Sequence, residues 1–211
     1  MIWKYAVCAL TFFVCLPFFM HYKKAMRYHL AAAFKTLGTL GAAVLAMIAA
    51  LRLDPRCWVC FAALMLHSVA DYLLEFNLYW GEGFFLAGHV CYIAFFLNLF
   101  PVSAVHVVAV ACLIGIEVFL FWRWRKPIGN RMLVFGVYAF VLAVTAGCAI
   151  GCLSGHVLQG QLIALGGALF IISDTLVFAR LLFTADRSVD WAVMILYYAA
   201  QLLFGISCLL I

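Results

Sequence analysis

Residues 61–76 read FAALMLHSVADYLLEF, and residues 165–183 read LGGALFIISDTLVFARLLF. Each stretch is apolar enough to lie within a membrane, yet the first contains Asp71 and the second Asp174. An ionisable side chain inside a bilayer costs about 2.5–3.5 kcal/mol on insertion scales. In a chain with only 10% charged residues, two such aspartates predict a shared polar cavity between helices, and we expect the function there.

The rest of the sequence has the composition of a membrane protein. Of its 211 residues, 70% are hydrophobic and 20 are Phe. A helix needs about 20 apolar residues to cross a bilayer, and the chain contains about eight such stretches. They cover residues 2–20, 30–51, 56–76, 81–100, 102–122, 131–152, 159–183 and 189–211. We therefore predict an all-α polytopic membrane protein, with residues 1–211 forming a single bundle, and we expect 2–20 to be a retained helix instead of a signal peptide.

The basic residues gather at alternate turns between these stretches. They are Lys23, Lys24, Arg27, Arg123, Arg125, Lys126, Arg131, Arg180 and Arg187. The other turns contribute Arg52 and Arg56. The positive-inside rule then places the first set of turns in the cytoplasm and both termini outside. The net charge of +5 is a topology signal of this kind and gives no indication of nucleic-acid binding.

The nine cysteines do not form a convincing metal site. Most lie within apolar stretches, where cysteine behaves as a small hydrophobic residue. Cys57 and Cys60 form one CxxC pair, with no second pair and no nearby histidine. We therefore expect neither a metal nor another cofactor.

The polar residues of five stretches lie at similar depths. Counted from the basic turns at about 1.5 Å per residue, Lys35 and Asp71 lie ~8 Å deep, and the others ~12–16 Å deep. Those others are His89, Asp174 and Gln201. Random placement would scatter these residues along the helices. The common depth predicts a pocket between 30–51, 56–76, 81–100, 159–183 and 189–211 that opens toward the basic turns.

Spacing within single helices adds further residues to this pocket. His67, Asp71 and Glu75 are four residues apart and share one helix face. Similar stripes comprise Phe85, His89 and Tyr92 on one stretch, and Tyr197 and Gln201 on another. Ser173 directly precedes Asp174, so at most one of these two can point fully inward.

Structural roles compete with functional ones for most of these side chains. A lysine can extend to lipid headgroups, histidines and a glutamate can be hydrogen-bonded inside a bundle, and tyrosines can sit at the membrane interface. The residues concerned are Lys35, His67, Glu75, His89, Tyr92 and Tyr197. The two aspartates can also join helices by hydrogen bonds alone, but their pairing favours a catalytic role.

Four segments together resemble one family of membrane proteins. They are ADYLLEF (70–76), GEGFFLAGHVCY (81–92), LGGALFIISDTLVFA (165–179) and YYAAQLL (197–203). Their order and spacing resemble the YhhN-like lysoplasmalogenase family. The positions that match its pattern are Lys35, Asp71, Gly81, Phe85, His89, Tyr92, Ser173, Asp174, Tyr197 and Gln201. The chain departs from the pattern at Thr36, where Pro is usual, at Ala70, where Gly is usual, and at His67, where Ser is common.

The resemblance implies hydrolysis of the vinyl ether bond of lysoplasmalogens, which releases a fatty aldehyde and glycerophospho-ethanolamine or -choline. It implies Asp71 and Asp174 as catalytic residues, and the matching positions Lys35, His89, Tyr92, Ser173, Tyr197 and Gln201 as substrate-binding residues. The helix face shared with Asp71 adds His67 and Glu75 to the expected binding set. The chemistry suits two carboxyls, because protonation of the vinyl carbon creates an oxocarbenium ion, as in glycosidases. The expected partners are a lysophospholipid substrate and membrane lipids, and Lys35 is a candidate for the substrate phosphate.

Three alternatives remain open from the residues. Another hydrolase of lysolipids or ether lipids would use the same cavity, and a zinc hydrolase would need His67 and His89 as ligands. A small proton-coupled transporter would use the carboxylates as a proton relay. Against a transporter, the sequence shows no clear internal repeat and no pair of helices broken by proline.

Overall fold

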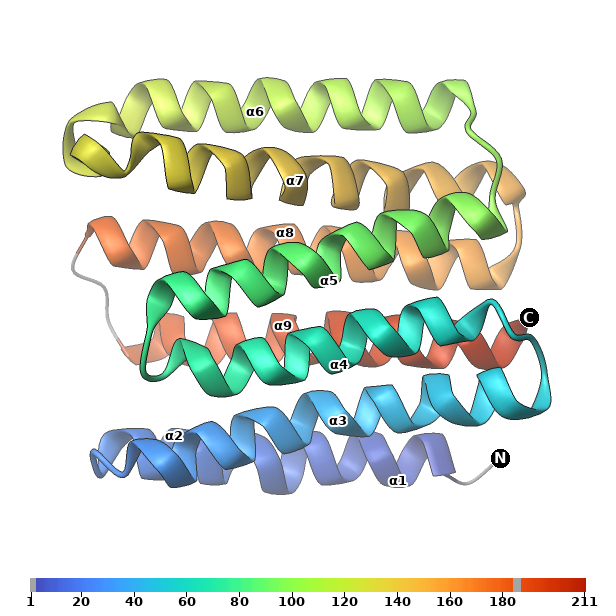
Figure 1. The fold of residues 1–211 in the computed structure, drawn as a ribbon, viewed down its shortest axis with the longest axis horizontal. Helices are drawn as coiled ribbons and strands as arrows, with labels where there is room; N and C mark the ends of the chain where they lie inside the picture. The colour runs from blue at the N-terminus through green and yellow to red at the C-terminus, as the bar shows by residue number, and fades with distance from the viewer. Residues whose placement is uncertain (1–2, 184–186) are drawn as a thin grey trace.

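The computed structural model describes residues 3–183 and 187–211, which are helical almost throughout and contain no strand (Figure 1). The first helix comprises α1 (Trp3–Leu10), a π-helical turn η1 (Thr11–Cys15) and α2 (Leu16–Lys24). The next three are α3 (Tyr28–Arg52), α4 (Cys57–Leu74) and α5 (Leu78–Leu99). The last four are α6 (Ala104–Ile128), α7 (Met132–Gly151), α8 (Leu158–Leu182) and α9 (Arg187–Ser207). Short 3-10 turns follow α6, α7 and α9, at η2 (Gly129–Arg131), η3 (Cys152–Gly155) and η4 (Cys208–Leu210).

Within the described residues, seven helical stretches are long and apolar enough to cross a membrane. One of them, Ala104–Gly155, is 52 residues long and reverses direction at η2, so it contains both α6 and α7 (Figure 1). When α6 and α7 are counted separately, the seven stretches correspond to eight membrane-crossing helices, which is about the number predicted. The structure thus confirms the predicted all-α, polytopic bundle.

Two helices extend beyond their predicted ends. The sequence placed Lys23 and Lys24 in a turn, but they form the last turn of α2, and the chain reverses only at Met26, where φ is 59°. The helix predicted to end at residue 122 continues as α6 to Ile128. Basic side chains near a helix C-terminus interact favourably with its dipole, so these residues stabilise the extra turns.

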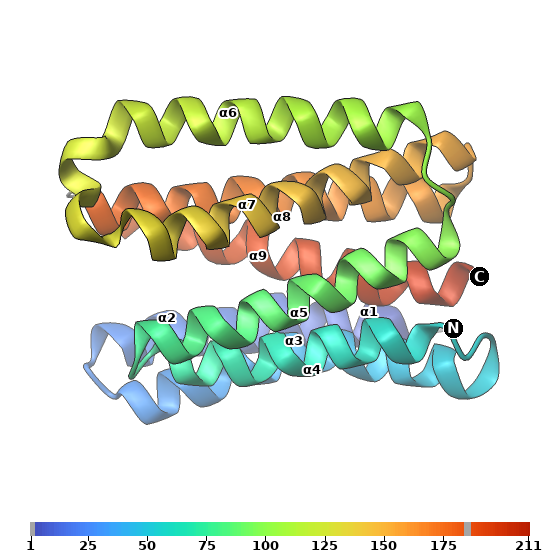
Figure 2. The same cartoon turned by 45° about the horizontal axis from the view of Figure 1, so that its top comes forward.

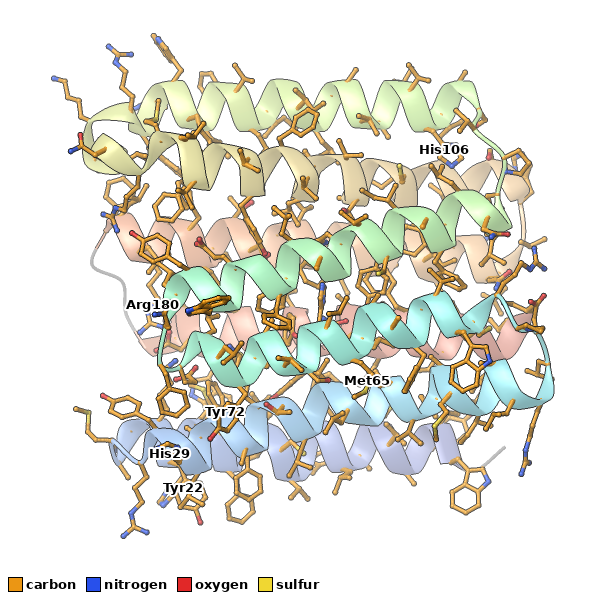
Figure 3. The ribbon with its side chains drawn as sticks, viewed as in Figure 1. Tyr22, His29, Met65, Tyr72, His106 and Arg180 are labelled. Atoms are coloured by element: carbon orange, nitrogen blue, oxygen red, sulfur yellow. The ribbon has the colours of Figure 1, made fainter. Side chains whose placement is uncertain are left out.

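Helices that follow one another along the chain run antiparallel, and both termini lie at the same end of the bundle (Figure 1). We call the opposite end, where α2, α4, α6 and α8 finish, the basic end. Lysine and arginine side chains occupy the last turns of α2, α6 and α8 there. In Figure 3 the labelled side chains of Tyr22, His29, Tyr72 and Arg180 lie toward this end, and that of His106 lies toward the other.

Helix α6 lies on the outside of the bundle and packs on α7, as the rotated view shows (Figure 2). Gly147 and Gly151 of α7 make this contact close. A Cβ atom at these positions would collide with Val110 and His106 of α6. Small residues four positions apart let two helices approach closely, and Gly147 and Gly151 form such a packing face.

Candidate active site

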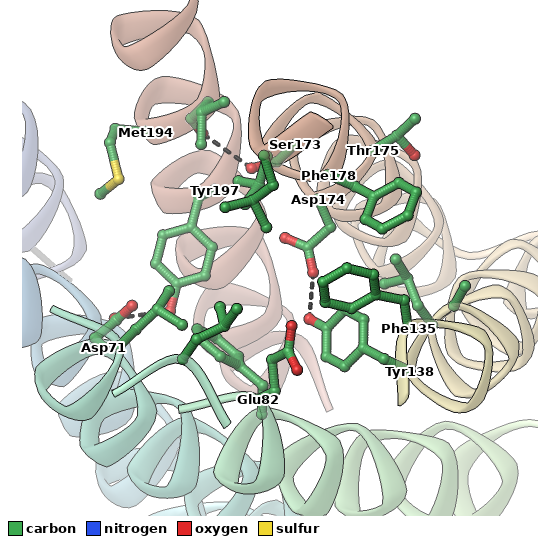
Figure 4. Close-up of a pocket in the computed structure, with 18 of the residues that line it drawn as sticks. Asp71, Glu82, Phe135, Tyr138, Ser173, Asp174, Thr175, Phe178, Met194 and Tyr197 are labelled. Atoms are coloured by element: carbon green, nitrogen blue, oxygen red, sulfur yellow. Dashed lines mark hydrogen bonds between the residues drawn. The ribbon is translucent and has the colours of Figure 1, made fainter. Parts of the chain in front are cut away.

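A cavity lies inside the bundle near the basic end. It encloses about 90 Å³, and the empty space reaches about 820 Å³ when its open side is included. Its wall is mostly apolar, and its polar residues are Lys35, Asp71, Glu82, Glu117, Tyr138, Ser173, Asp174, Thr175 and Tyr197. Figure 4 shows Asp71 and Asp174 on different sides of it, with Tyr197 between their helices and Glu82 opposite. The two aspartates at which the sequence analysis began therefore line one cavity.

The predicted boundary of the cavity was incomplete. The sequence predicted a pocket between the segments that form α3, α4, α5, α8 and α9. Glu117 and Phe121 of α6 also line it, as do Phe135 and Tyr138 of α7. Helices α6 and α7 therefore form part of the cavity wall together with the other five.

Asp71 is completely buried and surrounded by donors from other helices. Its Oδ2 accepts hydrogen bonds from Thr39 Oγ1 at 2.5 Å and from Tyr197 OH at 2.7 Å. Its Oδ1 lies 3.5 Å from Lys35 Nζ. One ammonium and two hydroxyl donors are an environment that suits a carboxylate.

A chain of alternating charges connects Asp71 to the basic end. Lys35 Nζ also lies 3.7 Å from Glu75 Oε1, and the same oxygen lies 3.1 Å from Lys23 Nζ. Glu75 follows the last residue of α4 and therefore reaches both α2 and α3. Of the predicted binding residues, Lys35 thus lines the cavity but is engaged by two carboxylates, and Glu75 holds Lys35 from outside the cavity wall.

Asp174 has a different environment. Its Oδ2 accepts a hydrogen bond of 2.5 Å from Tyr138 OH, and Glu82 points toward the same region (Figure 4). Among the described residues, no ion pair involves Asp174. The hydroxyl of the adjacent Ser173 does not bond to Asp174. It donates to the carbonyl oxygen of Val193 at 3.0 Å. Asp71 and Asp174 therefore line the same cavity, but their carboxyl groups have different hydrogen-bond and ion-pair partners.

Three further predicted residues form a hydrogen-bonded chain behind the cavity wall. Tyr92 OH donates to Gln201 Oε1 at 2.6 Å, and Gln201 Nε2 lies 2.7 Å from His67 Nδ1. His67 Nε2 lies 3.2 Å from the carbonyl oxygen of Phe85. Because a carbonyl can only accept, this network makes Nε2 the donor and leaves Nδ1 to accept from the amide. Both ring nitrogens of His67 are thus occupied, and none of the three residues lines the cavity.

His89 is buried beside this chain, and it does not line the cavity either. Its ring lies 5.0 Å from that of His67 and 5.9 Å from that of Tyr138, centroid to centroid. Neither ring nitrogen has a hydrogen-bond partner among the described residues. His67 and His89 therefore pack by their ring faces and edges, and in the described ranges no group of three His, Cys, Asp or Glu side chains could hold a metal ion.

Five polar residues of this site were not predicted from the sequence: Thr39, Glu82, Glu117, Tyr138 and Thr175. Glu117 interrupts the apolar run 110–121 in the same way that Asp71 and Asp174 interrupt theirs. The depth count would also have found it, because Glu117 and Tyr138 both lie ~8–11 Å from the predicted basic ends of their stretches. Thr39 carries no such signal, because a threonine within an apolar helix usually bonds its own backbone.

The site can hold an elongated apolar molecule against two carboxyl groups. The wall supplies Leu, Phe, Val and Met side chains, and the carboxyls come from helices on different sides. Among the described residues, one carboxyl accepts two hydrogen bonds and forms an ion pair with an ammonium group, and the other accepts a hydrogen bond from a phenol. Such a pair can divide the roles of proton donor and charge stabiliser.

Comparison with known proteins gives one match. The sequence model of the YhhN family matches residues 30–208, from the first turn of α3 to the start of η4. The matched segment contains every polar residue of the cavity wall. No curated protein and no solved structure matches the chain.

Proposed function

The chain belongs to the YhhN family, and on that basis we propose that it hydrolyses the vinyl ether bond of lysoplasmalogens. The products are a fatty aldehyde and glycerophospho-ethanolamine or -choline. The observation that carries the proposal is the pair of carboxyls in one largely apolar cavity, Asp71 beside an ammonium group and Asp174 beside a phenol. The substrate is a lipid, so a cavity among membrane-spanning helices gives its hydrocarbon chain an apolar surface.

In this proposal Asp174 is the proton donor. It lies among Tyr138, Glu82 and apolar side chains, and four carboxyl groups of the described residues line the cavity. Carboxyls enclosed together in apolar surroundings cannot all be ionised at low cost. Asp71, which faces Lys35, holds the negative charge, and Asp174 keeps its proton.

The reaction then proceeds in two stages. Asp174 transfers its proton to the β-carbon of the vinyl ether, and the double-bond electrons form the new C–H bond. The positive charge that develops is shared between the α-carbon and the ether oxygen, and the carboxylate of Asp71 stabilises it. Water adds to the α-carbon and gives up a proton to the Asp174 carboxylate. The hemiacetal hydroxyl then loses its proton to form the C=O bond of the aldehyde, the bond to the glycerol oxygen breaks, and that oxygen takes up a proton to become the glycerol hydroxyl.

Other residues support these two carboxyls. Tyr138 orients Asp174, while Thr39 and Tyr197 orient Asp71. The chain formed by Tyr92, Gln201 and His67 fixes α4, α5 and α9 relative to one another. It therefore contributes to the shape of the cavity without contacting the substrate.

The test is product analysis with purified protein in detergent. The protein is incubated with a lysoplasmalogen, with its saturated 1-alkyl ether and with its 1-acyl ester, and the products are identified by mass spectrometry. We expect aldehyde from the vinyl ether alone. Cleavage of the ester at a similar rate would indicate a lysophospholipase, and absence of any product would favour a transporter, since a transporter alters no bond.

A further inference from the structure

The catalytic cavity is a poor site for a phosphate group. Its described wall contains four carboxyl groups, those of Asp71, Glu82, Glu117 and Asp174, and one ammonium group, that of Lys35. Lys35 Nζ already lies 3.5 Å from Asp71 and 3.7 Å from Glu75. A phosphate that entered this wall would meet more negative than positive charge. The expectation that Lys35 binds the substrate phosphate therefore lacks support from its surroundings.

Positive charge is instead concentrated in a second hollow at the basic end. This open groove lies between α2 on one side and α8 and α9 on the other. It is lined by Pro17, Phe18, Met20, His21, Lys23, Lys24, Met26, Arg180, Asp190 and Trp191. The groove therefore combines several cationic side chains with an apolar floor and one tryptophan, a composition suited to the interfacial part of a lipid.

The cations of the groove are available to an anion. Lys24 is exposed at the end of α2. Lys23 has 38% of its side-chain surface exposed although it pairs with Glu75. Arg180 pairs with Asp190, which is the one acidic residue in the described lining. A phosphate in the groove would thus meet the exposed Lys24, and it would compete with Glu75 for Lys23 and with Asp190 for Arg180.

The groove and the cavity are neighbours on the same helices. On α9, Asp190 lines the groove and Val193 and Met194, one turn further on, line the cavity. On α8, Arg180 lines the groove and Leu181 the cavity. The ion contacts from Lys23 through Glu75 and Lys35 to Asp71 cross the same region. A molecule with its phosphate in the groove can therefore extend toward the aspartates.

We propose that this groove, lined by Lys23, Lys24 and Arg180, is the phosphate-binding part of the substrate site and takes the phosphodiester of a single-chain phospholipid. The proposal rests on the proposed function for the part that occupies the cavity. The glycerol and the ether oxygen then lie between the groove and the cavity. The hydrocarbon chain follows the apolar cavity wall, and the phosphate stays outside the ring of carboxyls.

Equilibrium binding tests the proposal without turnover. The probes are a radiolabelled 1-alkyl glycerophosphocholine, which contains no vinyl ether, and the 1-alkyl glycerol that lacks the phosphate. The first variant is Lys24→Gln, which should fold normally because Lys24 is exposed. The second is the double variant Arg180→Gln with Asp190→Asn, which removes both members of that ion pair together. Lys126→Gln is the control, because Lys126 is a basic residue at the same end of the bundle but outside the groove.

We expect each groove variant to weaken binding of the phosphate-bearing probe about tenfold, the effect of losing one charge-assisted contact, and to leave the 1-alkyl glycerol unaffected. Lys126→Gln should bind both probes as the wild type does. Equal losses for the two probes, or no loss for either, would overturn the proposal. In the active enzyme, Lys24→Gln should raise KM for lysoplasmalogen more than it lowers kcat.

Competition identifies the source of the phosphate. Soluble glycerophosphocholine should displace the labelled lysolipid only at much higher concentration, since it lacks the chain. If it competes as well as the unlabelled lysolipid, the groove is a site for free phosphodiesters and the lipid assignment is wrong. If a diacyl phosphatidylcholine competes equally, the groove holds a bulk membrane lipid and is not part of the substrate site. If the wild type binds the phosphate-bearing probe selectively yet cleaves no vinyl ether, the proposed function fails while the phosphate site stands.

Discussion

Lys35 Nζ lies 3.5 Å from Asp71 Oδ1, and the two side chains are 8% and 0% exposed. Asp71 therefore has a fixed counter-charge inside the bundle. Asp174 lines the same cavity and has a phenol as its neighbour. This difference in neighbours is the reason for assigning different roles to the two aspartates.

Replacing either aspartate by asparagine should abolish hydrolysis of the vinyl ether. General acid-base groups contribute about 10²–10⁴-fold to rate, and we expect Asp71→Asn and Asp174→Asn each to lose at least this much. Asp54→Asn is the control, because Asp54 lies between α3 and α4, away from the cavity, where hydrogen bonds from Arg56 lower the pKa of its carboxyl. The measurement is aldehyde release by variants whose elution on size exclusion matches the wild type. A loss of only a few-fold from both cavity variants would mean that the aspartates act as hydrogen-bonding links between helices.

Tyr138→Phe should lower kcat about tenfold or more, because it removes the hydrogen bond from the phenol that orients Asp174. Tyr197→Phe should have a smaller effect, since Asp71 retains Thr39 and Lys35 as partners. Steady-state kinetics of the two variants side by side make the comparison. The reverse order would contradict the assignment of Asp174 as the proton donor.

Lys35→Met should destabilise the protein strongly. It leaves the carboxylate of Asp71 buried without its counter-charge, and breaking such a pair costs about 3–5 kcal/mol. Adding Asp71→Asn to Lys35→Met should restore part of the lost stability, since the remaining group is then neutral. Thermal unfolding in detergent measures both changes. If the double variant is less stable than Lys35→Met alone, the ion pair is not the main role of Lys35.

Metal chelators should leave the activity unchanged. The proposed mechanism uses only carboxyl groups and water, and both ring nitrogens of His67 are engaged by Gln201 and Phe85. The experiment is to dialyse the purified protein against EDTA and to measure both aldehyde release and zinc content. Stoichiometric zinc whose removal abolishes activity would replace the two-carboxyl mechanism with a metal-dependent one.

A saturated 1-alkyl lysolipid should inhibit competitively, with an affinity close to that of the vinyl ether substrate. Its hydrocarbon chain and its phosphate make the same contacts with the protein, but it has no double bond to accept a proton. Its affinity should therefore match that of the substrate, since binding and chemistry use different groups. Inhibition kinetics with the two ethers of matched chain length provide the measurement. An inhibition constant far above KM would show that the double bond itself is needed for recognition.

Several features of this protein follow from its sequence alone. The apolar stretches predicted the helices and the polytopic bundle. Of the five residues predicted to share one depth, Lys35, Asp71 and Asp174 line one cavity, whereas His89 and Gln201 lie behind its wall. The rise of a helix is constant, so a residue number fixes the position of a side chain along the helix axis. The order of short motifs further indicated the family that the comparison then identified.

Only the tertiary structure decided which polar groups meet. Thr39 and Tyr197 are 158 residues apart yet converge on Asp71, while Tyr138 of α7 reaches Asp174 of α8. It also placed His67, Tyr92 and Gln201 behind the cavity wall. The physical reason is that depth depends on position within one helix, whereas contact depends on how each helix is rotated and which helices it packs against. Those choices arise from side-chain packing between segments distant in the chain, which no local pattern records.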